Sequence, residues 1–331
     1  MQRTTIPNTD LTVSRIAMGC WSLSGDATWG DQPEEDSIAA VHAAIDAGID
    51  FFDNAEMYGN GLSEERLGKA LVGRRDQVVI ATKFSQENAR YDDVIAACER
   101  SLRRLQTDYI DLYQVHWYNR EVPLDETWRA LDALREQGKV RYTGVCNFGV
   151  RDLDDALRVG RPVTDQLPYS LLFRAIEYEI VPKCLRENIG ILCYSPLAIG
   201  LLTGKFHHAD EVPPGRGRSR HFSKNRPLTR HGEDGAEEET FAAIAAIEKV
   251  AAEEGIPLVE LALAWLLHRP GVTAVISGIR NPRQAESNAK AGDLALSEEL
   301  VAKLDELTRP LKEKLGTNPD MWEGSAKSRY R

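Results

Sequence analysis

The sequence predicts an α/β protein of the (β/α)8 TIM barrel class, and three observations lead to this prediction. Short apolar runs alternate with longer amphipathic stretches along most of the chain, as strands alternate with helices in such folds. Eight short runs are present, which is the strand number of this barrel. Their spacing is roughly 30 residues in most cases, the size of one βα unit. A doubly wound open sheet would carry a Gly-rich turn after its first strand, and Met18-Gly19-Cys20-Trp21 offers none.

The predicted strands are brief and mostly apolar, as expected for parallel strands that are buried on both faces. They are Arg15–Gly19, Ile49–Asp53, Val78–Thr82, Leu112–His116, Tyr142–Cys146, Val163–Leu167, Ile191–Tyr194 and Thr273–Ile276. Ahead of them, two β-prone runs, Thr4–Ile6 and Leu11–Val13, flank the turn residues 7–10. This pattern predicts an N-terminal β-hairpin.

The predicted helices between the strands carry apolar residues at i, i+3 and i+4. They are Glu34–Ala47, Ser63–Leu71, Asp92–Leu105, Leu124–Gln137, Arg151–Val159 and Glu177–Glu187. We expect Ser63 to cap the start of its helix. Gly48 and Gly138 stand where a glycine commonly ends a helix.

The last unit of the chain is longer than the others. A loop at residues 207–235 precedes predicted helices at Ala236–Glu253 and Leu258–His268. Another helix is expected near Glu298–Leu307, followed by a polar tail at residues 309–331. Because no linker divides the chain, we expect one domain over residues 1–331, with its core at about 4–307.

The composition is that of an ordinary globular protein. Hydrophobic residues make up 42% of the 331 positions and charged residues 28%, which is too apolar for a disordered chain. The formal net charge of −10 argues against nucleic acid and anionic membranes as partners, because both are themselves negatively charged. We therefore expect a small-molecule substrate and neither a nucleic-acid nor a membrane partner.

The cysteines and the N-terminus predict a cytoplasmic protein. The five cysteines are scattered and form no C-x-x-C pair, so we expect reduced, mostly buried thiols. The first residues lack a basic start followed by an apolar run, which predicts no signal peptide. The most apolar longer stretch, Ile189–Leu202, is broken by two glycines and Pro196 and does not read as a membrane span.

Polar residues at the ends of consecutive strands predict an active site. In a (β/α)8 barrel, the active site lies where the strands end. Asp53 ends the second predicted strand, Lys83 follows the third and His116 ends the fourth. Tyr58 lies five positions past Asp53, in a glycine-containing loop. We expect these four side chains to meet at one mouth of the barrel.

Each of these residues also has an ordinary structural explanation. Asp53 could cap a helix, Tyr58 could pack in its loop, and His116 could be a satisfied barrel histidine. Lys83 is different, because it follows an apolar strand and lysine is almost never buried without a partner. Asp53 is the natural partner. We expect Lys83 to lower the pKa of Tyr58 and His116 to hold a substrate oxygen, so that together they polarise a carbonyl while a hydride arrives.

Several segments resemble the aldo-keto reductase family. They are Phe51–Gly59, Ala81–Lys83, Val115–His116, Gly138–Phe148, Tyr194–Leu197 with Gly204–Lys205, and Val275–Asn288. Residues 169–177 resemble the bacterial branch that is related to potassium-channel β subunits. The resemblance covers about Thr4 to Leu307 and implies NADPH-dependent reduction of an aldehyde or ketone, including sugars. It places the catalytic tetrad on Asp53, Tyr58, Lys83 and His116, with Tyr58 as general acid.

The same resemblance implies the residues that would bind NADP(H). The nicotinamide would contact Asn147, Gln166 and Tyr194; the pyrophosphate path would contain Ser195, Leu197, Gly200, Leu202 and Lys205. The adenosine end, with its 2′-phosphate, would contact Ser277, Gly278, Ile279, Arg280, Gln284 and Asn288. Two positions differ from the usual family pattern, because Cys146 replaces Ser and Ser287 replaces Glu.

Other features add to this hypothesis. Trp21, Trp29 and Trp117 follow strand ends and are expected to line a substrate pocket or simply to pack there. The arginines between Arg216 and Arg230 either form a lid over the cofactor or belong to a solvated loop. No set of residues has the spacing of metal ligands, so we expect no metal.

Two functional alternatives remain at this stage. One is a cofactor-binding regulatory subunit with little turnover, as the channel-related branch suggests. The other is a different barrel enzyme, such as a glycoside hydrolase, which would need two carboxylates at strand ends. Only Asp53 is clearly placed at one.

Overall fold

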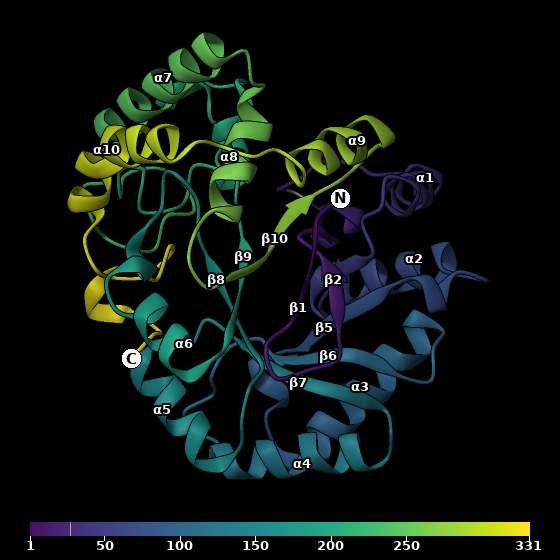
Figure 1. Cartoon of the computed structure of the whole chain (residues 1–331). Helices are drawn as coiled ribbons and strands as arrows, with labels where there is room; N and C mark the ends of the chain where they lie inside the picture. The colour runs from purple at the N-terminus through teal and green to yellow at the C-terminus, as the bar shows by residue number, and fades with distance from the viewer. Residues whose placement is uncertain (27) are drawn as a thin grey trace.

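Eight parallel strands form a closed barrel, as predicted (Figure 1). The computed structural model describes residues 1–26 and 28–331. The barrel strands are β3 (Ile16–Gly19), β4 (Phe51–Asp53), β5 (Val79–Phe84), β6 (Ile110–Val115), β7 (Val140–Cys146), β8 (Thr164–Pro168), β9 (Gly190–Tyr194) and β10 (Val272–Gly278). β10 pairs with β3 and closes the ring. β5 is longer than expected, so that Lys83 lies within it rather than after it.

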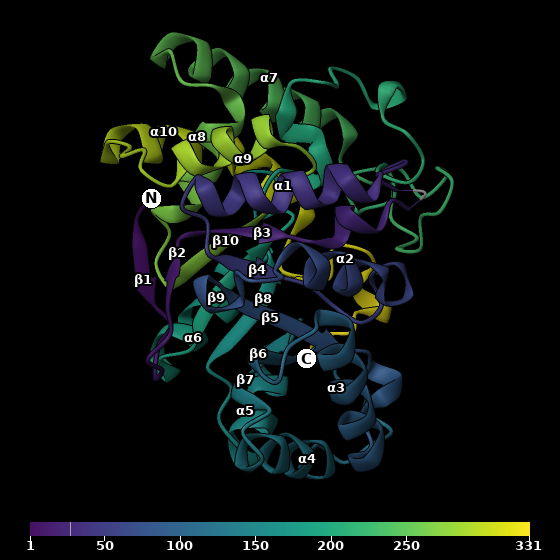
Figure 2. The ribbon, with the colours of Figure 1, turned by 90° about the vertical axis from the view of Figure 1, so that its right-hand side faces the viewer.

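The predicted hairpin closes one end of the barrel. It consists of the antiparallel strands β1 (Arg3–Thr5) and β2 (Thr12–Ser14). Its apolar residues Ile6, Leu11 and Val13 are buried and pack with Phe51 and Leu112 of the barrel interior. Figure 2 shows the hairpin at one end of the barrel and the long loop after β9 toward the other. The mouth at which the strands finish is therefore the other end of the barrel.

Ten α-helices are found among the described residues, most of them around the barrel (Figures 1 and 2). They are α1 (Glu34–Asp46), α2 (Leu62–Ala70), α3 (Tyr91–Leu105), α4 (Leu124–Glu136), α5 (Val150–Val159), α6 (Ile180–Glu187), α7 (Glu237–Glu254), α8 (Leu258–Leu267), α9 (Pro282–Ala291) and α10 (Glu298–Leu315). Their apolar faces pack on the outer side of the strands in one large buried cluster. Gly48 and Gly138 adopt the positive φ angles expected just past a helix end.

Three details of the helices differ from the prediction. Ser63 does not cap α2, because the helix begins one residue earlier and the Ser63 hydroxyl donates to the Cys20 carbonyl. Helix α9 was not expected, although Asn281 caps it through the Gln284 N–H. Helix α10 continues to Leu315, past Pro310, so the polar tail begins later than residue 309.

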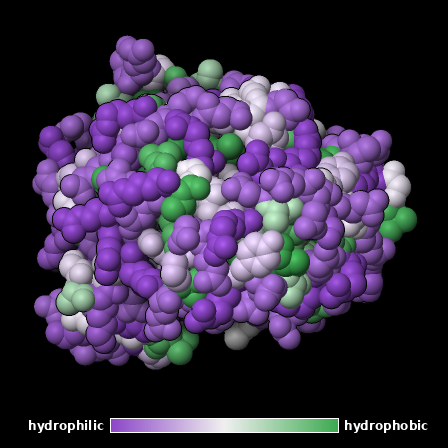
Figure 3. All heavy atoms as spheres, turned by 90° about the horizontal axis from the view of Figure 1, so that it is seen from below, coloured by the Kyte–Doolittle hydropathy of each residue, from purple (hydrophilic) through white to green (hydrophobic). Residues whose placement is uncertain are grey.

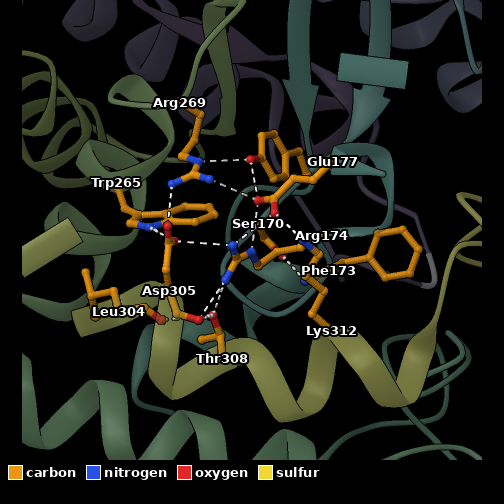
Figure 4. Close-up of polar contacts among 11 residues, drawn as sticks. Ser170, Phe173, Arg174, Glu177, Trp265, Arg269, Leu304, Asp305, Thr308 and Lys312 are labelled. Atoms are coloured by element: carbon orange, nitrogen blue, oxygen red, sulfur yellow. Dashed lines mark hydrogen bonds and ion pairs between the residues drawn. The ribbon is translucent and has the colours of Figure 1, made fainter. Parts of the chain in front are cut away.

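A network of buried and half-buried charged and polar side chains fastens α10 to the rest of the molecule (Figure 4). We call it the α10 network: Tyr169, Arg174, Glu177, Trp265, Arg269, Asp305, Thr308 and Lys312. Arg174 donates two hydrogen bonds of 2.9 Å to the Glu177 carboxylate and one of 2.9 Å to the Thr308 hydroxyl. On the other side, Arg269 donates to Asp305 at 2.8 Å. Arginine forks and carboxylates thus satisfy each other across three separate chain segments.

The C-terminal segment, residues 316–331, folds back onto the molecule as an ordered loop. Asp320 is fully buried and accepts two hydrogen bonds of 2.8 Å from the Arg329 guanidinium. From the long loop, Arg220 donates to the carbonyls of Leu315 and Asn318. The segment expected to be a polar tail is therefore held by buried, charge-assisted hydrogen bonds.

The remaining expectations about surface and thiols can be compared with the structure. All five cysteines are free and buried, as predicted. Within residues 1–26 and 28–331, no helix is both long and apolar enough to cross a membrane. Figure 3 shows one face of the molecule, on which apolar side chains occur in small groups among hydrophilic ones.

Candidate active site

The strand ends bring Asp53, Tyr58, Lys83 and His116 together at the mouth where the strands finish. Asp53 is the last residue of β4, Lys83 lies near the end of β5, and His116 directly follows β6. The Lys83 ammonium lies 2.7 Å from Asp53 Oδ2 and 3.4 Å from Tyr58 Oη. The rings of Tyr58 and His116 meet edge to face, with centroids 6.1 Å apart. We call these four residues the mouth cluster.

Lys83 uses all three of its N–H groups. It donates to Asp53 Oδ2, to the carbonyl of Asn54 at 2.6 Å, and to Tyr58 Oη. Burial opposes the charge, but Asp53 and then Tyr58 raise the pKa of Lys83 above its ordinary value. Because an ammonium can only donate, the Tyr58 oxygen accepts, and its own hydrogen is free for another partner.

The pKa of Tyr58 differs from the sequence-based expectation. Burial raises it to about 12, and the lowering effect of the Lys83 charge is smaller than this desolvation. Lys83 thus lowers the pKa as expected, but the net shift is upward, because desolvation of the phenol outweighs the lysine charge. Tyr58 is protonated at neutral pH, which is the form needed to give a proton.

His116 is neutral for a similar reason. Burial, followed by the positive charges of Lys83 and Arg329, lowers its pKa well below the ordinary value of 6.5. Its buried Nδ1 has no hydrogen-bond partner among the described residues. The ring is thus an uncharged polar group beside the Tyr58 hydroxyl.

The side-chain amides of Asn147 and Gln166 are held in defined orientations. Asn147 Nδ2 donates at 3.1 Å to the His116 carbonyl, an atom that can only accept. Gln166 Nε2 donates at 2.7 Å to Asp53 Oδ1. Asn147 therefore keeps a second N–H that can donate to a ligand, and Gln166 keeps its Oε1 atom as an acceptor. Tyr194 joins them, because its hydroxyl donates to Asn147 Oδ1 at 2.9 Å.

Aromatic side chains surround this cluster. The Trp21 ring stacks on Tyr58 at 5.9 Å, and Trp29 contacts Trp21 edge to face at 5.3 Å. Trp117, the residue after His116, packs against Tyr330 at 5.7 Å. The tryptophans expected to line a substrate pocket thus lie beside the mouth cluster.

The loop after β9 contains the residues expected along the pyrophosphate. Ser195 and Ile199 have positive φ angles of 51° and 57°, which are unusual for residues other than glycine. The N–H groups of Gly200 and Leu202 are already used, because both donate to the Leu197 carbonyl. Lys205 is exposed. Backbone strain of this kind concentrates at binding sites.

The end of β10 and the start of α9 gather the six residues expected at the adenosine: Ser277, Gly278, Ile279, Arg280, Gln284 and Asn288. Asn288 donates to the Ser277 hydroxyl at 2.9 Å, and Gln284 accepts from the Arg280 backbone N–H at 2.8 Å. The Arg280 guanidinium donates to oxygen atoms of residues 29–32. Arg280 therefore joins this cluster to the loop after β3.

The basic loop divides into two groups of arginines. Arg226 donates to the carbonyls of Ala209 and Val212 within the loop, and Arg220 donates to those of Leu315 and Asn318 outside it. Arg216 lies over the Trp29 ring, and a Cβ atom on Gly200 would lie 3.2 Å from its Nη1. Burial and the charge of Arg280 lower the pKa of Arg216. Positive charge is thus available between the loop after β9 and the β10 cluster.

The chain matches the Aldo/keto reductase family model over residues 15–309. It belongs to the aldo-keto reductase family. A curated relative, the aldo-keto reductase YhdN of Bacillus subtilis (strain 168), is 36% identical over 312 residues, which cover 90% of this chain and 91% of that protein. A probable voltage-gated potassium channel β subunit of Oryza sativa subsp. japonica is 30% identical over 327 residues, covering 92% and 96%.

Solved structures agree with this membership. An aldo-keto reductase from Klebsiella pneumoniae in complex with NADPH superposes with a TM-score of 0.73 at 32% identity, covering 93% of this chain and 96% of that one. Membership of the aldo-keto reductase family excludes the glycoside hydrolase that the sequence left open.

The C-terminal segment adds contacts to the candidate site that the sequence did not indicate. Tyr330 is buried, and its hydroxyl donates to Asn147 Oδ1 at 2.7 Å. The Arg329 guanidinium lies 3.5 Å from the centroid of the Trp117 ring. Trp322 lies under Arg218 of the long loop. The aromatic residues in an otherwise polar tail were the one sequence signal that could have placed this segment at the mouth.

Proposed function

We propose that this aldo-keto reductase is an NADP(H)-dependent oxidoreductase that reduces an aldehyde or ketone to an alcohol. Asp53, Tyr58, Lys83 and His116 are its catalytic residues, and Tyr58 is the general acid. Family membership and the contacts among the four side chains support the proposal. The aromatic walls around the mouth favour a substrate with an apolar or ring-shaped body, sugars included.

The residues of the mouth fit a nicotinamide. Its carboxamide has one oxygen that accepts and an NH2 group that donates, and Asn147 and Gln166 keep one donor and one acceptor for such a group. These two residues would hold the carboxamide, and Tyr194 would lie against the ring. The bound NADPH of the Klebsiella relative supports the same choice.

The phosphate groups would be held by the residues after β9 and β10. Arg280 and Arg216 supply positive charge, and an arginine fork matches phosphate oxygens. Ser195, Leu197, Gly200, Leu202 and Lys205 would line the pyrophosphate; Ser277, Gly278, Ile279, Gln284 and Asn288 would surround the adenosine. Arg216 and Arg218 would form the part of the long loop that covers the cofactor.

When bound, the cofactor supplies a hydride to the carbonyl carbon. The substrate oxygen accepts hydrogen bonds from Tyr58 and from the neutral His116 ring, which polarises the carbonyl. As the carbon gains the hydride, the Tyr58 proton moves to the oxygen and completes the alcohol. The phenolate that remains lies beside the Lys83 ammonium, which Asp53 keeps charged and in place. Water then returns the proton to Tyr58.

One observation carries this proposal: Lys83 can only donate to Tyr58, so the Tyr58 proton is directed away from the lysine. The test is NADPH oxidation with a panel of aldehydes and ketones, comparing the wild type with Tyr58→Phe. The variant should bind NADPH normally and lose roughly 100-fold or more in turnover, the scale of general acid catalysis. Tyr91→Phe, an exposed tyrosine on α3, is the control and should keep its activity. A fully active Tyr58→Phe would refute the assignment.

A cofactor-binding regulatory subunit is the second candidate, because the chain is similar to the plant channel subunits. This role predicts tight retention of NADP(H) with negligible turnover on every carbonyl of the panel. Ready turnover of any of them favours the enzyme.

A further inference from the structure

We propose that Tyr330 is a positioning residue for the nicotinamide: its hydroxyl holds the Asn147 side chain in the orientation that recognises the carboxamide. The inference rests on the proposed function, because it needs Asn147 to be a cofactor contact. It adds a residue from the end of the C-terminal segment to a site that is otherwise built from strand ends.

The hydrogen bonds around Asn147 define one orientation of its amide. Oδ1 accepts from Tyr330 at 2.7 Å and from Tyr194 at 2.9 Å, which occupies both lone pairs. Nδ2 donates to the His116 carbonyl. If the amide were turned over, its oxygen would face the His116 carbonyl oxygen, and its NH2 group would face the two phenols. The second N–H therefore remains as the group that faces a ligand.

Tyr330 can serve as a reliable donor because it is buried. Its ring is 7% exposed, and burial raises the pKa of its hydroxyl well above the ordinary value of 10. The hydroxyl is protonated at any ordinary pH. Asn147 is itself only 4% exposed, so the contact lies away from competing water.

The residue before Tyr330 is fixed on three sides. The Arg329 guanidinium donates to both carboxylate oxygens of Asp320 and lies over the Trp117 ring. The Arg329 carbonyl accepts from Arg120 at 2.8 Å. The ring of Trp117, which follows His116 in the chain, also packs against the ring of Tyr330.

The residue after Tyr330 is fixed as well. The Arg331 N–H donates to Asp152 Oδ2 at 2.9 Å, and its carbonyl accepts from the Arg151 N–H at 2.8 Å. Gly149 makes room for this approach, because a Cβ atom there would lie 2.0 Å from the Arg331 carbonyl oxygen. Because the contacts of Arg329 and Arg331 fix the backbone on both sides of Tyr330, its hydroxyl stays within hydrogen-bond distance of Asn147.

The first experiment compares the binding of NADP+ with that of 2′,5′-ADP, which lacks the nicotinamide, to the full-length chain by calorimetry. Tyr330→Phe keeps the ring and removes the hydroxyl. NADP+ should bind about 5-fold more weakly, the change expected for one neutral hydrogen bond, while binding of 2′,5′-ADP is unchanged. Tyr142→Phe is the matched control, because it removes a tyrosine hydrogen bond to Asp10 at the hairpin end of the barrel.

The second experiment asks whether Tyr330 acts through Asn147. In an Asn147→Ala background, Tyr330→Phe should have no further effect on NADP+ affinity, because the amide that it positions is gone. A merely structural role of the hydroxyl would weaken binding equally in both backgrounds. The melting temperature of each variant, measured in parallel, reports folding.

Three outcomes overturn the proposal. They are unchanged NADP+ binding in Tyr330→Phe, equal weakening of NADP+ and 2′,5′-ADP, and tighter NADP+ binding, which would mean that the hydroxyl competes with the cofactor. Failure of the proposed function gives a different result. In that case the wild type binds neither molecule, or binds both equally well.

Discussion

The mouth cluster and the α10 network both combine acidic, basic and tyrosine side chains that are buried or half-buried, but they differ in how completely these side chains are paired. In the mouth cluster, the Tyr58 proton and the His116 ring have no partner among the described residues. In the α10 network, Glu177 accepts hydrogen bonds from Arg174, Lys312 and Tyr169. Between these two clusters, the difference lies in the unpaired hydrogen-bonding groups of the candidate active site, because both clusters contain charge that is at least partly buried.

The pKa shifts follow the same division. Burial dominates at the mouth, where it raises the pKa of Tyr58 to about 12 and lowers that of His116. In the α10 network, burial alone would raise the pKa of Glu177, but hydrogen bonds and charge from Arg174 and Lys312 lower it to about 2. At the mouth, burial thus favours the neutral forms of Tyr58 and His116, whereas under α10 the partners of Glu177 favour its charged form.

The largest effect is expected for Lys83→Met. Turnover should fall by roughly 1000-fold, because the phenolate left by proton transfer loses its neighbouring charge. Stability should also fall by about 3 kcal/mol, because Asp53 becomes a buried carboxylate without its cation. Steady-state kinetics and urea unfolding measure the two quantities. Adding Asp53→Asn should restore stability but not turnover; recovery of turnover would contradict the assigned role of Lys83.

For Arg174→Met we expect a loss of stability with nearly unchanged turnover. Removing this arginine leaves Glu177 and Asp305 with fewer partners and should lower the free energy of unfolding by about 3 kcal/mol. Turnover, measured well below the melting temperature, should stay within about 2-fold of the wild type, since the polar contacts of Arg174 go to Glu177, Asp305 and Thr308 and not to the mouth cluster. A large loss of turnover with unchanged stability would contradict a purely structural role for the α10 network.

The pH dependence should show the protonation states of the mouth. Reduction needs the Tyr58 phenol, and with a pKa of about 12 the phenol persists, so kcat/KM for reduction should be flat from about pH 6 to about pH 9. Alcohol oxidation needs the phenolate and should rise about tenfold per pH unit over the same range. These profiles are measured at saturating cofactor, so kcat/KM for the carbonyl or the alcohol reports the enzyme–cofactor complex before the second substrate binds. A fall in reduction that begins near neutral pH would contradict a raised Tyr58 pKa.

The smallest effect is expected where a charge pair is exposed. Arg158 and Asp155 form an ion pair on α5 in which the arginine side chain is 73% exposed. Arg158→Ala should change the free energy of unfolding by no more than about 0.5 kcal/mol, because solvent and salt screen such pairs. The same urea titration provides the comparison with Arg174→Met. If Arg158→Ala lowered the free energy of unfolding as much as Arg174→Met, burial of the ion pair would not explain how much each arginine contributes to stability.

Much of the fold followed from the sequence because barrel strands and helices are repetitive and their patterns are local. The eight strands, the hairpin and the meeting of Asp53, Lys83 and His116 at one mouth could be predicted from alternation and from strand ends. Where local signals compete, the prediction was less good. Ser63 has the chemistry of a helix cap but bonds to the Cys20 carbonyl instead, a tertiary contact that no local pattern contains.

The C-terminal segment could not be placed because its contacts are long-range. Tyr330 meets Asn147 across 183 positions of the chain, and the contacts of Arg329 with Asp320 and of Arg331 with Asp152 hold it there. The pKa of Tyr58 was misjudged for a related reason. Its neighbour Lys83 could be predicted, whereas the extent of burial, which has the larger effect, depends on residues from the whole mouth.

The five buried cysteines make the rate of thiol labelling a measure of local unfolding of the barrel. Thiol reagents attack the thiolate, and burial raises the pKa of the Cys98 thiol to about 12, so the folded state reacts slowly. Cys20 follows β3, Cys98 lies on α3 and Cys184 on α6. The order in which a dye labels these three positions would therefore report which sector of the barrel separates first from its neighbours.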